Sequence, residues 1–177
     1  MVWYFAVTRG FLMTLELVVD EELQLKEFRP EDAAAIFNLI DRNRAHLSQH
    51  GDDTAQKYPT ETVVYESIVH PKNPQRKRFG MWSEDTLVGS INLTLEGHSA
   101  EIGYYLGSEF QGKKYMTRSV RRIVSYGFDE LGLKRIYAKV HVQNMASRAV
   151  LMAAGFSFIT LKGESAIYVQ NRNITTT

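Results

Sequence analysis

Three apolar or alternating stretches, set close together, constrain the fold of this chain more than any other feature. Lys77–Trp82, Thr86–Leu95 and Ala100–Leu106 each have the length of a strand, and short turns at Ser83–Asp85 and Glu96–His98 lie between them. Connections this short join antiparallel neighbours, because a parallel crossover needs a dozen or more residues. The sequence therefore predicts an antiparallel meander at the centre of the fold.

Strand and helix patterns continue on both sides of this meander. Upstream, the alternating stretches Leu15–Asp20 and Leu23–Phe28 are typical of short strands. They precede one helix that begins at Pro30 and a second that Thr60 or Thr62 caps. The downstream pattern predicts, in order, a helix, a strand, a helix and two strands: Met116–Leu131, Arg135–Val142, Asn144–Ala154, Phe156–Leu161 and Ala166–Gln170.

The chain is predicted to form one domain, since its 177 residues suit a single core. The element order predicts an α+β, or mixed α/β, fold in which helices cover both faces of one sheet. We expect the domain to span residues 15–172, with residues 1–14 as an extension or an extra edge strand and residues 173–177 as a tail. The polar residues 43–58 are expected to be mostly loop, with room for a short helical turn.

Composition and charge exclude several classes of protein. Apolar residues make up 44% and charged residues 23% of the chain, which is ordinary globular usage and argues against disorder. The net charge of +1 gives no overall field for nucleic acid or an anionic membrane, so neither partner is predicted. The absence of cysteine excludes disulfides and agrees with a cytoplasmic location. His46 and His50 lack a third ligand in view, so no metal site is predicted.

The loop after the meander has the properties of an anion site. It reads EFQGKKYM and opens a helix near Met116, so free backbone N–H groups and the positive end of the helix dipole lie in one small volume. Lys113, Lys114 and Arg118 add positive charge around it. A basic turn whose charges are solvated has the same pattern, and the loop alone does not separate the two interpretations.

A second segment, VQNMASRAVLMAAGF, strengthens the case for a ligand site. Asn144 follows a strand, and Ser147 lies three residues later on the same face of the next helix, so both point toward the end of the preceding strand. Taken singly, Asn144 is an ordinary N-cap and Ser147 an ordinary polar residue of a first helical turn. The pairing of this segment with the basic loop carries the information.

The two segments together resemble the GCN5-related N-acetyltransferase (GNAT) superfamily. The stretch AEIGYYLGSEFQGKKYMTRSVRRIVSYGFDELGLKRIYAKVHVQNMASRAVLMAAGF follows the core of that family in order and spacing. LQLKEFRPEDAAAIFNLIDRNRAHL is similar to the branch that acetylates the N-termini of ribosomal proteins. The resemblance covers most of the chain from about Leu15 onward. It implies the GNAT fold with a mostly antiparallel, splayed sheet, acetyl-CoA as acyl donor, a primary amine as acceptor, and a homodimer as an open option.

The resemblance also implies which residues bind the donor. The family pattern at the loop is Gln or Arg, two residues, Gly, one residue, then Gly or Ala; Gln111 matches, but Lys114 and Met116 replace the two small residues. Both replacements crowd the place where backbone approaches the pyrophosphate. N–H donation needs no glycine there if φ stays negative, and Lys114 could itself pair with a phosphate. A splayed and bulged strand at Tyr104–Leu106 would bind the pantetheine arm. The implied donor-binding residues are Tyr104, Tyr105, Leu106, Gln111, Gly112, Lys113, Lys114, Tyr115, Met116, Thr117, Asn144 and Ser147.

Acetyl transfer to an amine requires a base and a group that helps the thiolate leave. We predict Glu101 as the base, because strand alternation puts it close to where the sulfur should lie, although a solvated strand glutamate has the same pattern. Many relatives use a tyrosine as the acid; Leu151 takes that position here, and the ribosomal-protein branch implies Ser147 instead. The glutamate that this branch carries beyond the serine has no clean counterpart, Glu164 being the nearest.

The predicted function is therefore acetyl-CoA-dependent N-acetyl transfer to a primary amine, either a protein N-terminus or a small amine. Two alternatives stay open. The replacements at Lys114, Met116 and Leu151 also fit a non-catalytic acyl-CoA-binding module. A small-molecule acetyltransferase for polyamines or aminoglycosides fits the same motifs, because one fold of this kind serves many amines.

Overall fold

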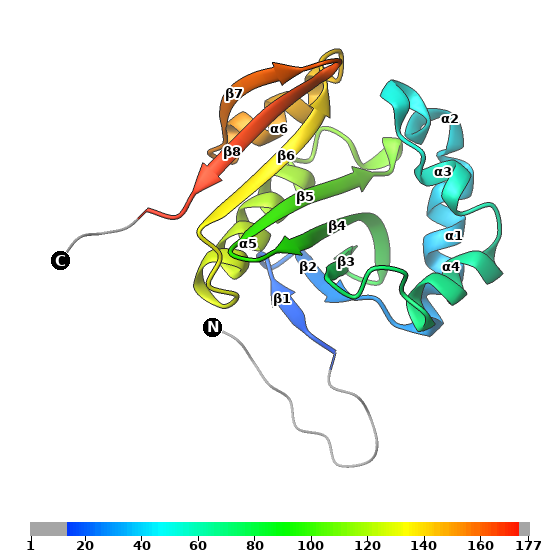
Figure 1. Cartoon of the computed structure of the whole chain (residues 1–177). Coiled ribbons are helices and arrows are strands. Elements are labelled where there is room, and N and C mark those ends of the chain that lie inside the picture. The colour runs from blue at the N-terminus through cyan, green and yellow to red at the C-terminus, as the bar shows by residue number, and fades with distance from the viewer. Residues whose placement is uncertain (1–13, 174–177) are drawn as a thin grey trace.

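The predicted meander forms the centre of one eight-stranded sheet (Figure 1). The computed structural model describes residues 14–173. Its strands are β1 (Glu16–Val18), β2 (Leu23–Glu27), β3 (Arg76–Ser83), β4 (Thr86–Glu96), β5 (Ser99–Leu106), β6 (Arg135–His141), β7 (Ser157–Lys162) and β8 (Ser165–Asn171). They lie in the order β1-β2-β3-β4-β5-β6-β8-β7, and all neighbours are antiparallel except β5 and β6. The mixed fold and the mostly antiparallel sheet are confirmed.

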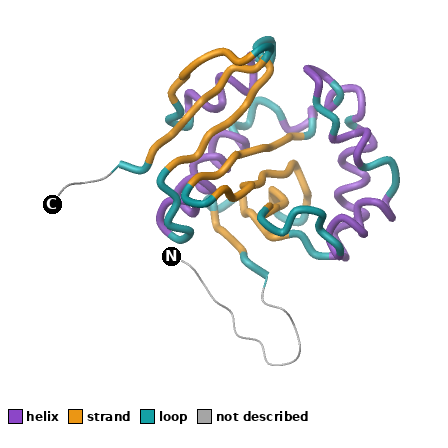
Figure 2. The backbone as a smooth tube through the Cα atoms, in the orientation of Figure 1, coloured by secondary structure: helices purple, strands orange, loops and turns teal. Residues whose placement is uncertain are grey.

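Helices cover both faces of the sheet, as predicted (Figure 2). The helices are α1 (Ala33–Arg42), α2 (Arg44–Leu47), α3 (Thr54–Lys57), α4 (Glu61–Val69), α5 (Tyr115–Asp129) and α6 (Met145–Ala153). Of three short 3-10 turns, η1 (Pro30–Asp32) and η3 (Ser108–Phe110) each lie between a strand and a helix, and η2 (Gln49–Gly51) lies between α2 and α3. No helix in the range 14–173 is long and apolar enough to cross a membrane.

Two apolar clusters hold these layers together. On one face, α5 buries Val120, Ile123 and Val124 against the central strands. On the other face, α1 buries Ile36 and Leu39 in a separate cluster with α4. Each such side chain contributes about 1.5–3 kcal/mol when it leaves water. The two helical layers are therefore held against opposite sides of one sheet.

The sheet splays between β5 and β6. The two parallel strands pair only over Ser99–Glu101 and Arg135–Tyr137, and beyond that point they diverge (Figure 1). The remaining β5 segment, Ile102–Leu106, keeps β4 as its neighbour on one side, and no strand within residues 14–173 pairs with it on the other. Its backbone N–H and C=O groups on the open side are therefore available to a ligand.

The β-bulge lies elsewhere than the sequence suggested. We expected it in the splayed strand at Tyr104–Leu106, but β4 and β5 pair there without a register shift. The shift instead falls between Met81 and Trp82 in the pairing of β3 with β4, where Val88 is left without a partner. Its carbonyl oxygen accepts a hydrogen bond of 2.9 Å from the N–H of Gly107, so the bulge ties β4 to the end of β5.

Residues 43–58 contain more regular structure than the expected loop with room for one short helical turn. They contain α2, η2 and α3, and the Arg44 guanidinium gathers these turns by donating to the carbonyl oxygens of Ala55, Tyr58 and Pro59. The expected extension at residues 1–14 lies outside the described residues apart from Thr14. The expected tail at residues 173–177 lies outside them apart from its first residue.

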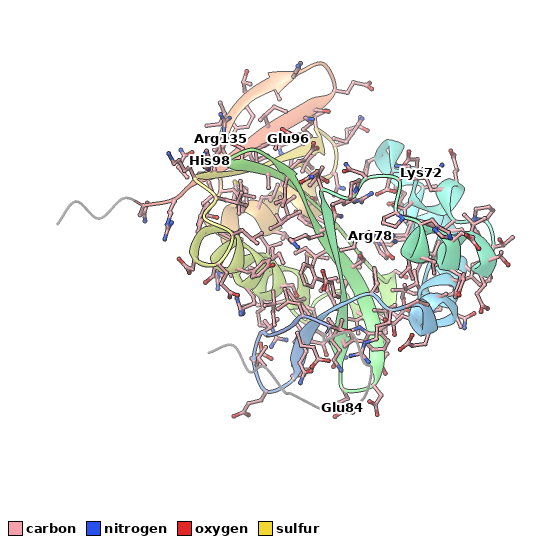
Figure 3. All side chains as sticks on the ribbon, turned by 60° about the horizontal axis from the view of Figure 1, so that its bottom comes forward. Lys72, Arg78, Glu84, Glu96, His98 and Arg135 are labelled. Atoms are coloured by element: carbon pink, nitrogen blue, oxygen red, sulfur yellow. The ribbon has the colours of Figure 1, made fainter. Side chains whose placement is uncertain are left out.

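The two ends of the meander have different surroundings (Figure 3). Glu96 and His98 mark the β4–β5 turn, where Arg135 begins β6 and the sheet is still closed. Glu84 marks the β3–β4 turn at the far end, on the side toward which the splay opens. Arg78 lies between the sheet and the α1–α4 layer, and its guanidinium donates to the carbonyl oxygen of Ser67 at 3.1 Å.

Candidate active site

A cleft of about 580 Å³ opens beside the splayed end of β5. Its walls are the end of β5, the loop that begins α5, the first turn of α6, and the α2–η2 segment. The predicted donor-binding residues that line it are Tyr104, Tyr105, Leu106, Gln111, Gly112, Lys114, Tyr115, Met116, Thr117, Asn144 and Ser147. Lys113 is exposed and does not line the cleft. Two segments that are distant in sequence therefore meet here, as the pairing of motifs indicated.

The loop before α5 has the backbone shape of an anion-binding nest. Gly112 has φ of 81°, and Lys114, the N-cap of α5, has φ of 59° and ψ of 16°. The N–H groups of the first helical turn, from Tyr115 to Thr117, have no acceptor within the helix. Successive N–H groups in such a turn converge on one point, where the helix dipole also favours negative charge.

Lys114 adopts the left-handed backbone conformation that glycine prefers. Its φ is positive, so the condition under which the loop could do without glycine is not met. A residue with a Cβ pays roughly 1–2 kcal/mol for this conformation. The side chain makes no hydrogen bond or ion pair with any residue in the described part of the chain. The Lys114 ammonium is therefore free to face an anion in the cleft.

Met116, the second replacement, crowds the loop less than expected. Its side chain is 6% exposed and belongs to the core cluster beneath α5. Its backbone N–H stays in the first turn of the helix, where small residues would otherwise be found. The Met116 side chain therefore packs in the core.

Arg118 does not supply the free positive charge that we expected near the loop. Its guanidinium donates to Asp20 at 2.5 Å and to Glu22 at 3.1 Å, both in the turn between β1 and β2. The Tyr115 hydroxyl also donates to Glu22. These hydrogen bonds, from Tyr115 first and then Arg118, lower the pKa of the Glu22 carboxyl. Lys114 is consequently the cation of this basic group that faces the cleft.

Asn144 and Ser147 form the opposite wall. The Asn144 side chain accepts a hydrogen bond of 3.0 Å from the backbone N–H of Ser147, so Asn144 is the N-cap of α6 as its position indicated. The Ser147 hydroxyl lies 2.8 Å from the hydroxyl of Tyr104 on β5. Burial raises the pKa of the Tyr104 hydroxyl well above its ordinary range. Tyr105, the next residue, points to the other face of the sheet, where burial raises its pKa as well.

Glu101 lies apart from the cleft lining. Its carboxylate accepts hydrogen bonds from Lys139 at 3.1 Å and from Tyr137 at 3.4 Å, on the strand pair that is still closed. It lines neither the cleft nor the hollow beside it. Its role as a base stays a prediction.

A second hollow of about 320 Å³ adjoins the cleft through the gap between β5 and β6. The walls of the two hollows share six residues: Gln49, His50, Asp52, Tyr104, Asn144 and Ser147. Together they provide an opening that reaches from the α5–α6 side of the sheet to the α2–η2 side. A donor and an acceptor could therefore meet near Ser147 from different directions.

The α2–η2 segment was missed as part of the site. His46, Gln49, His50 and Asp52 line the cleft, and the His50 ring stacks on His141 of β6 with ring centroids 5.7 Å apart. A polar loop carries no periodicity that would place it in a fold, so the sequence offered only the pair of histidines as a signal. Within residues 14–173, no group of three or more potential ligands could hold a metal ion.

Comparison with known proteins decides the family. A family model described as "Acetyltransferase (GNAT) domain" matches residues 22–157. The chain belongs to the GNAT acetyltransferase family. It is similar to the Bacillus subtilis "Probable N-acetyltransferase YjcK", with 35% identity over 71% of this chain and 75% of that protein. It is also similar to the Bacillus subtilis protein described as "Putative ribosomal N-acetyltransferase YdaF". The two are 30% identical over 78% of this chain and 79% of that protein.

Solved GNAT structures share the fold. RimL, described as a ribosomal L7/L12 alpha-N-protein acetyltransferase in complex with coenzyme A, matches with a TM-score of 0.78 and 21% identity over 88% of this chain and 97% of its own. The predicted resemblance and the splayed GNAT fold are thus confirmed. This protein is an N-acetyltransferase of the GNAT type.

Proposed function

We propose that this GNAT enzyme transfers the acetyl group of acetyl-CoA to the α-amine of a protein N-terminus. The observation that carries the proposal is the meeting of the α5 loop, the open edge of β5 and Ser147 in one cleft that continues through the sheet. The cleft fits the donor, because its nest of N–H groups suits a pyrophosphate and the unpaired edge of β5 suits the amides of an extended arm.

Each group in the cleft has a separate role in donor binding or acetyl transfer. Amides from Gly112 to Thr117, with Lys114, hold the phosphates, and the open backbone of Tyr104–Leu106 holds the arm and polarises the thioester carbonyl. The acceptor nitrogen loses a proton and bonds to the acetyl carbon, the carbon–sulfur bond breaks, and the thiolate gains a proton. The Ser147 hydroxyl, which lines both hollows, donates its hydrogen bond to the leaving sulfur. Glu101 remains the predicted base, acting through water because it lies outside the lining.

The charges of the opening favour a peptide N-terminus over a polyamine. Asp52 is the one carboxylate that lines either hollow in the part of the chain that the structure describes. A polyamine carries several ammonium groups, and a site for it needs several carboxylates along its length. A single carboxylate beside polar side chains suits one terminal ammonium group and an uncharged peptide backbone. The name of YdaF, which refers to ribosomal N-acetylation, supports the same choice.

An acceptor screen tests the proposal. Release of free CoA thiol is measured with peptides that begin with serine or alanine, with the same peptides blocked at the N-terminus but containing lysine, with spermidine and with an aminoglycoside. Turnover limited to the free N-termini is expected. Faster turnover of spermidine would refute the peptide assignment. If acetyl-CoA binds but no amine in the screen causes release of the CoA thiol, the non-catalytic module would be favoured.

Asp52 provides a matched pair of variants for the acceptor side. Asp52→Asn should raise the KM for the peptide by about fivefold, because an exposed ion pair contributes up to about 1 kcal/mol. Asp53→Asn changes a neighbouring carboxylate that pairs with Lys57 and does not line the cleft, so its KM should stay at the wild-type value. Equal KM values for both variants would remove Asp52 from the acceptor site. A homodimer and a cytoplasmic location stay predictions.

A further inference from the structure

Tyr104 brings a second hydroxyl to Ser147 from a different part of the fold. Its ring rises from β5 on the face that packs against α5 and α6, and Ser147 lies in the first turn of α6. The two hydroxyl oxygens are 2.8 Å apart, and the Tyr104 hydroxyl also lies 3.2 Å from the Ser147 carbonyl oxygen. Both residues line the cleft and the adjoining hollow. The contact therefore lies inside the site already described.

The direction of the hydrogen bond decides what Ser147 can do. Each hydroxyl has one proton to donate and can accept from a partner. If Tyr104 donates to the Ser147 oxygen, the serine proton is free to point into the cleft. If Tyr104 donates to the carbonyl oxygen instead, the serine proton is used up on Tyr104. The 2.8 Å contact between the hydroxyls is common to both arrangements. A phenol is a stronger donor and a weaker acceptor than an aliphatic hydroxyl, which favours the first arrangement.

Burial keeps the Tyr104 hydroxyl protonated, so it can donate a hydrogen bond. Its hydroxyl is largely buried, and burial raises its pKa by disfavouring the phenolate. It therefore stays protonated over the working range of pH and gives no proton away. Leu151 stands where many relatives of this family carry a tyrosine, and its side chain is fully buried and apolar. A hydroxyl from β5 thus reaches the serine, while the corresponding helix position provides none.

We propose that Tyr104 is a positioning residue that fixes the Ser147 hydroxyl as a hydrogen-bond donor to the leaving sulfur of the acyl donor. No proton passes from Tyr104 in this arrangement: it donates one hydrogen bond to Ser147 Oγ, and Ser147 donates one to the sulfur. Hydrogen bonds in a chain polarise one another, so the bond from serine to a developing thiolate becomes stronger. The inference rests on the proposed acetyl transfer and adds a residue to it.

Titration of bound coenzyme A tests this without any acceptor. Binding of coenzyme A and of desulfo-coenzyme A is measured by calorimetry, and the thiol of the bound coenzyme A is titrated by its thiolate absorbance against the desulfo complex. In wild type, the donated hydrogen bond should hold the pKa of that thiol down. Tyr104→Phe and Ser147→Ala should each raise it by about one unit, as expected for one charge-assisted hydrogen bond. Their binding of desulfo-coenzyme A should be unchanged.

A double-mutant cycle on turnover provides the second readout. With the best acceptor of the screen, Tyr104→Phe should lower kcat about tenfold while leaving the KM for acetyl-CoA unchanged. Adding Tyr104→Phe to Ser147→Ala should cost nothing more, because the tyrosine acts through the serine. Tyr168→Phe is the matched control: it removes another buried tyrosine hydroxyl that contacts α6, through Arg148, but does not line the cleft. Its kcat should match that of wild type.

The outcomes separate the two levels of the proposal. If coenzyme A does not bind to wild type, both the acetyl transfer and the role of Tyr104 are refuted. If it binds and Tyr104→Phe leaves the thiol pKa unchanged, the positioning role alone is refuted. A rise in kcat for Tyr104→Phe would show that the tyrosine withholds the serine proton, which is the opposite arrangement. If the double variant loses kcat by the product of the two single-variant losses, the tyrosine does not act through the serine and the positioning role is also refuted.

Discussion

The left-handed conformation of Lys114 gives a prediction that separates backbone strain from charge. Replacing Lys114 by glycine removes the Cβ that makes φ of 59° unfavourable, which relieves about 1–2 kcal/mol. Glycine also gives the unfolded chain more freedom, which costs about 0.5–1 kcal/mol. The net gain in the free energy of unfolding should be about 0.5–1 kcal/mol. For a chain of this length, that corresponds to a rise in Tm of about 1–4 °C.

Lys114→Ala is the matched control. Alanine keeps a Cβ at the strained position and removes the same ammonium group, so Tm should stay close to the wild-type value. Both variants lose the charge that faces the cleft, and an exposed ion pair contributes up to about 1 kcal/mol. Each should therefore bind acetyl-CoA up to about fivefold more weakly at low salt, and the difference from wild type should shrink at high salt.

The assays are thermal denaturation and calorimetric titration with acetyl-CoA. A Tm for Lys114→Gly equal to or below that of Lys114→Ala would refute the reasoning about strain. Tighter binding of acetyl-CoA to Lys114→Gly than to wild type would refute the role of the ammonium group. It would show instead that the side chain crowds the loop.

Three further predictions concern stability. Ser119 has a fully buried hydroxyl without a hydrogen-bond partner in the described part of the chain, so Ser119→Ala should raise the free energy of unfolding by about 1 kcal/mol; a loss in chemical denaturation would contradict this. Hydrogen bonding, from Tyr115 first, lowers the pKa of Glu22 below its ordinary value of 4.5. This contribution to stability is present above that value and lost as pH falls through the lowered pKa, so the Tm difference between wild type and Glu22→Gln should shrink as the pH is lowered below 4.5; a constant difference would contradict it. A Cβ at Gly89 would lie 2.5 Å from the carbonyl oxygen of Tyr105, so Gly89→Ala should lower stability by about 1–3 kcal/mol in the same denaturation assay; an unchanged midpoint would show that β4 can move.

Local pattern explains the features that the sequence could predict. Short turns required the β3–β4–β5 meander to be antiparallel, and the spacing of Val120, Ile123 and Val124 required one face of α5 to be buried. Asn144 caps α6 because its side chain reaches a backbone N–H only three residues away. These outcomes depend on neighbours in the chain, so periodicity and residue type were sufficient.

The sequence could not specify contacts between distant segments. Arg118 looked like a free cation beside the loop, but Asp20 and Glu22 neutralise it from a turn nearly a hundred residues earlier. The polar segment that contains His50 and Asp52 became a wall of the cleft only because Arg44 gathers its turns against the sheet. Charge and polarity alone do not say which groups will be partners.

By itself, the sequence determined the order of the elements, the basic loop at a helix start, and a serine one turn into the next helix. The tertiary structure decided which of these groups are free to act. It placed Lys114 in a strained conformation facing the cleft, and it brought the Tyr104 hydroxyl to Ser147 across two elements. The physical reason is that helices and strands arise from interactions close in sequence, whereas a site depends on how elements far apart in sequence pack together.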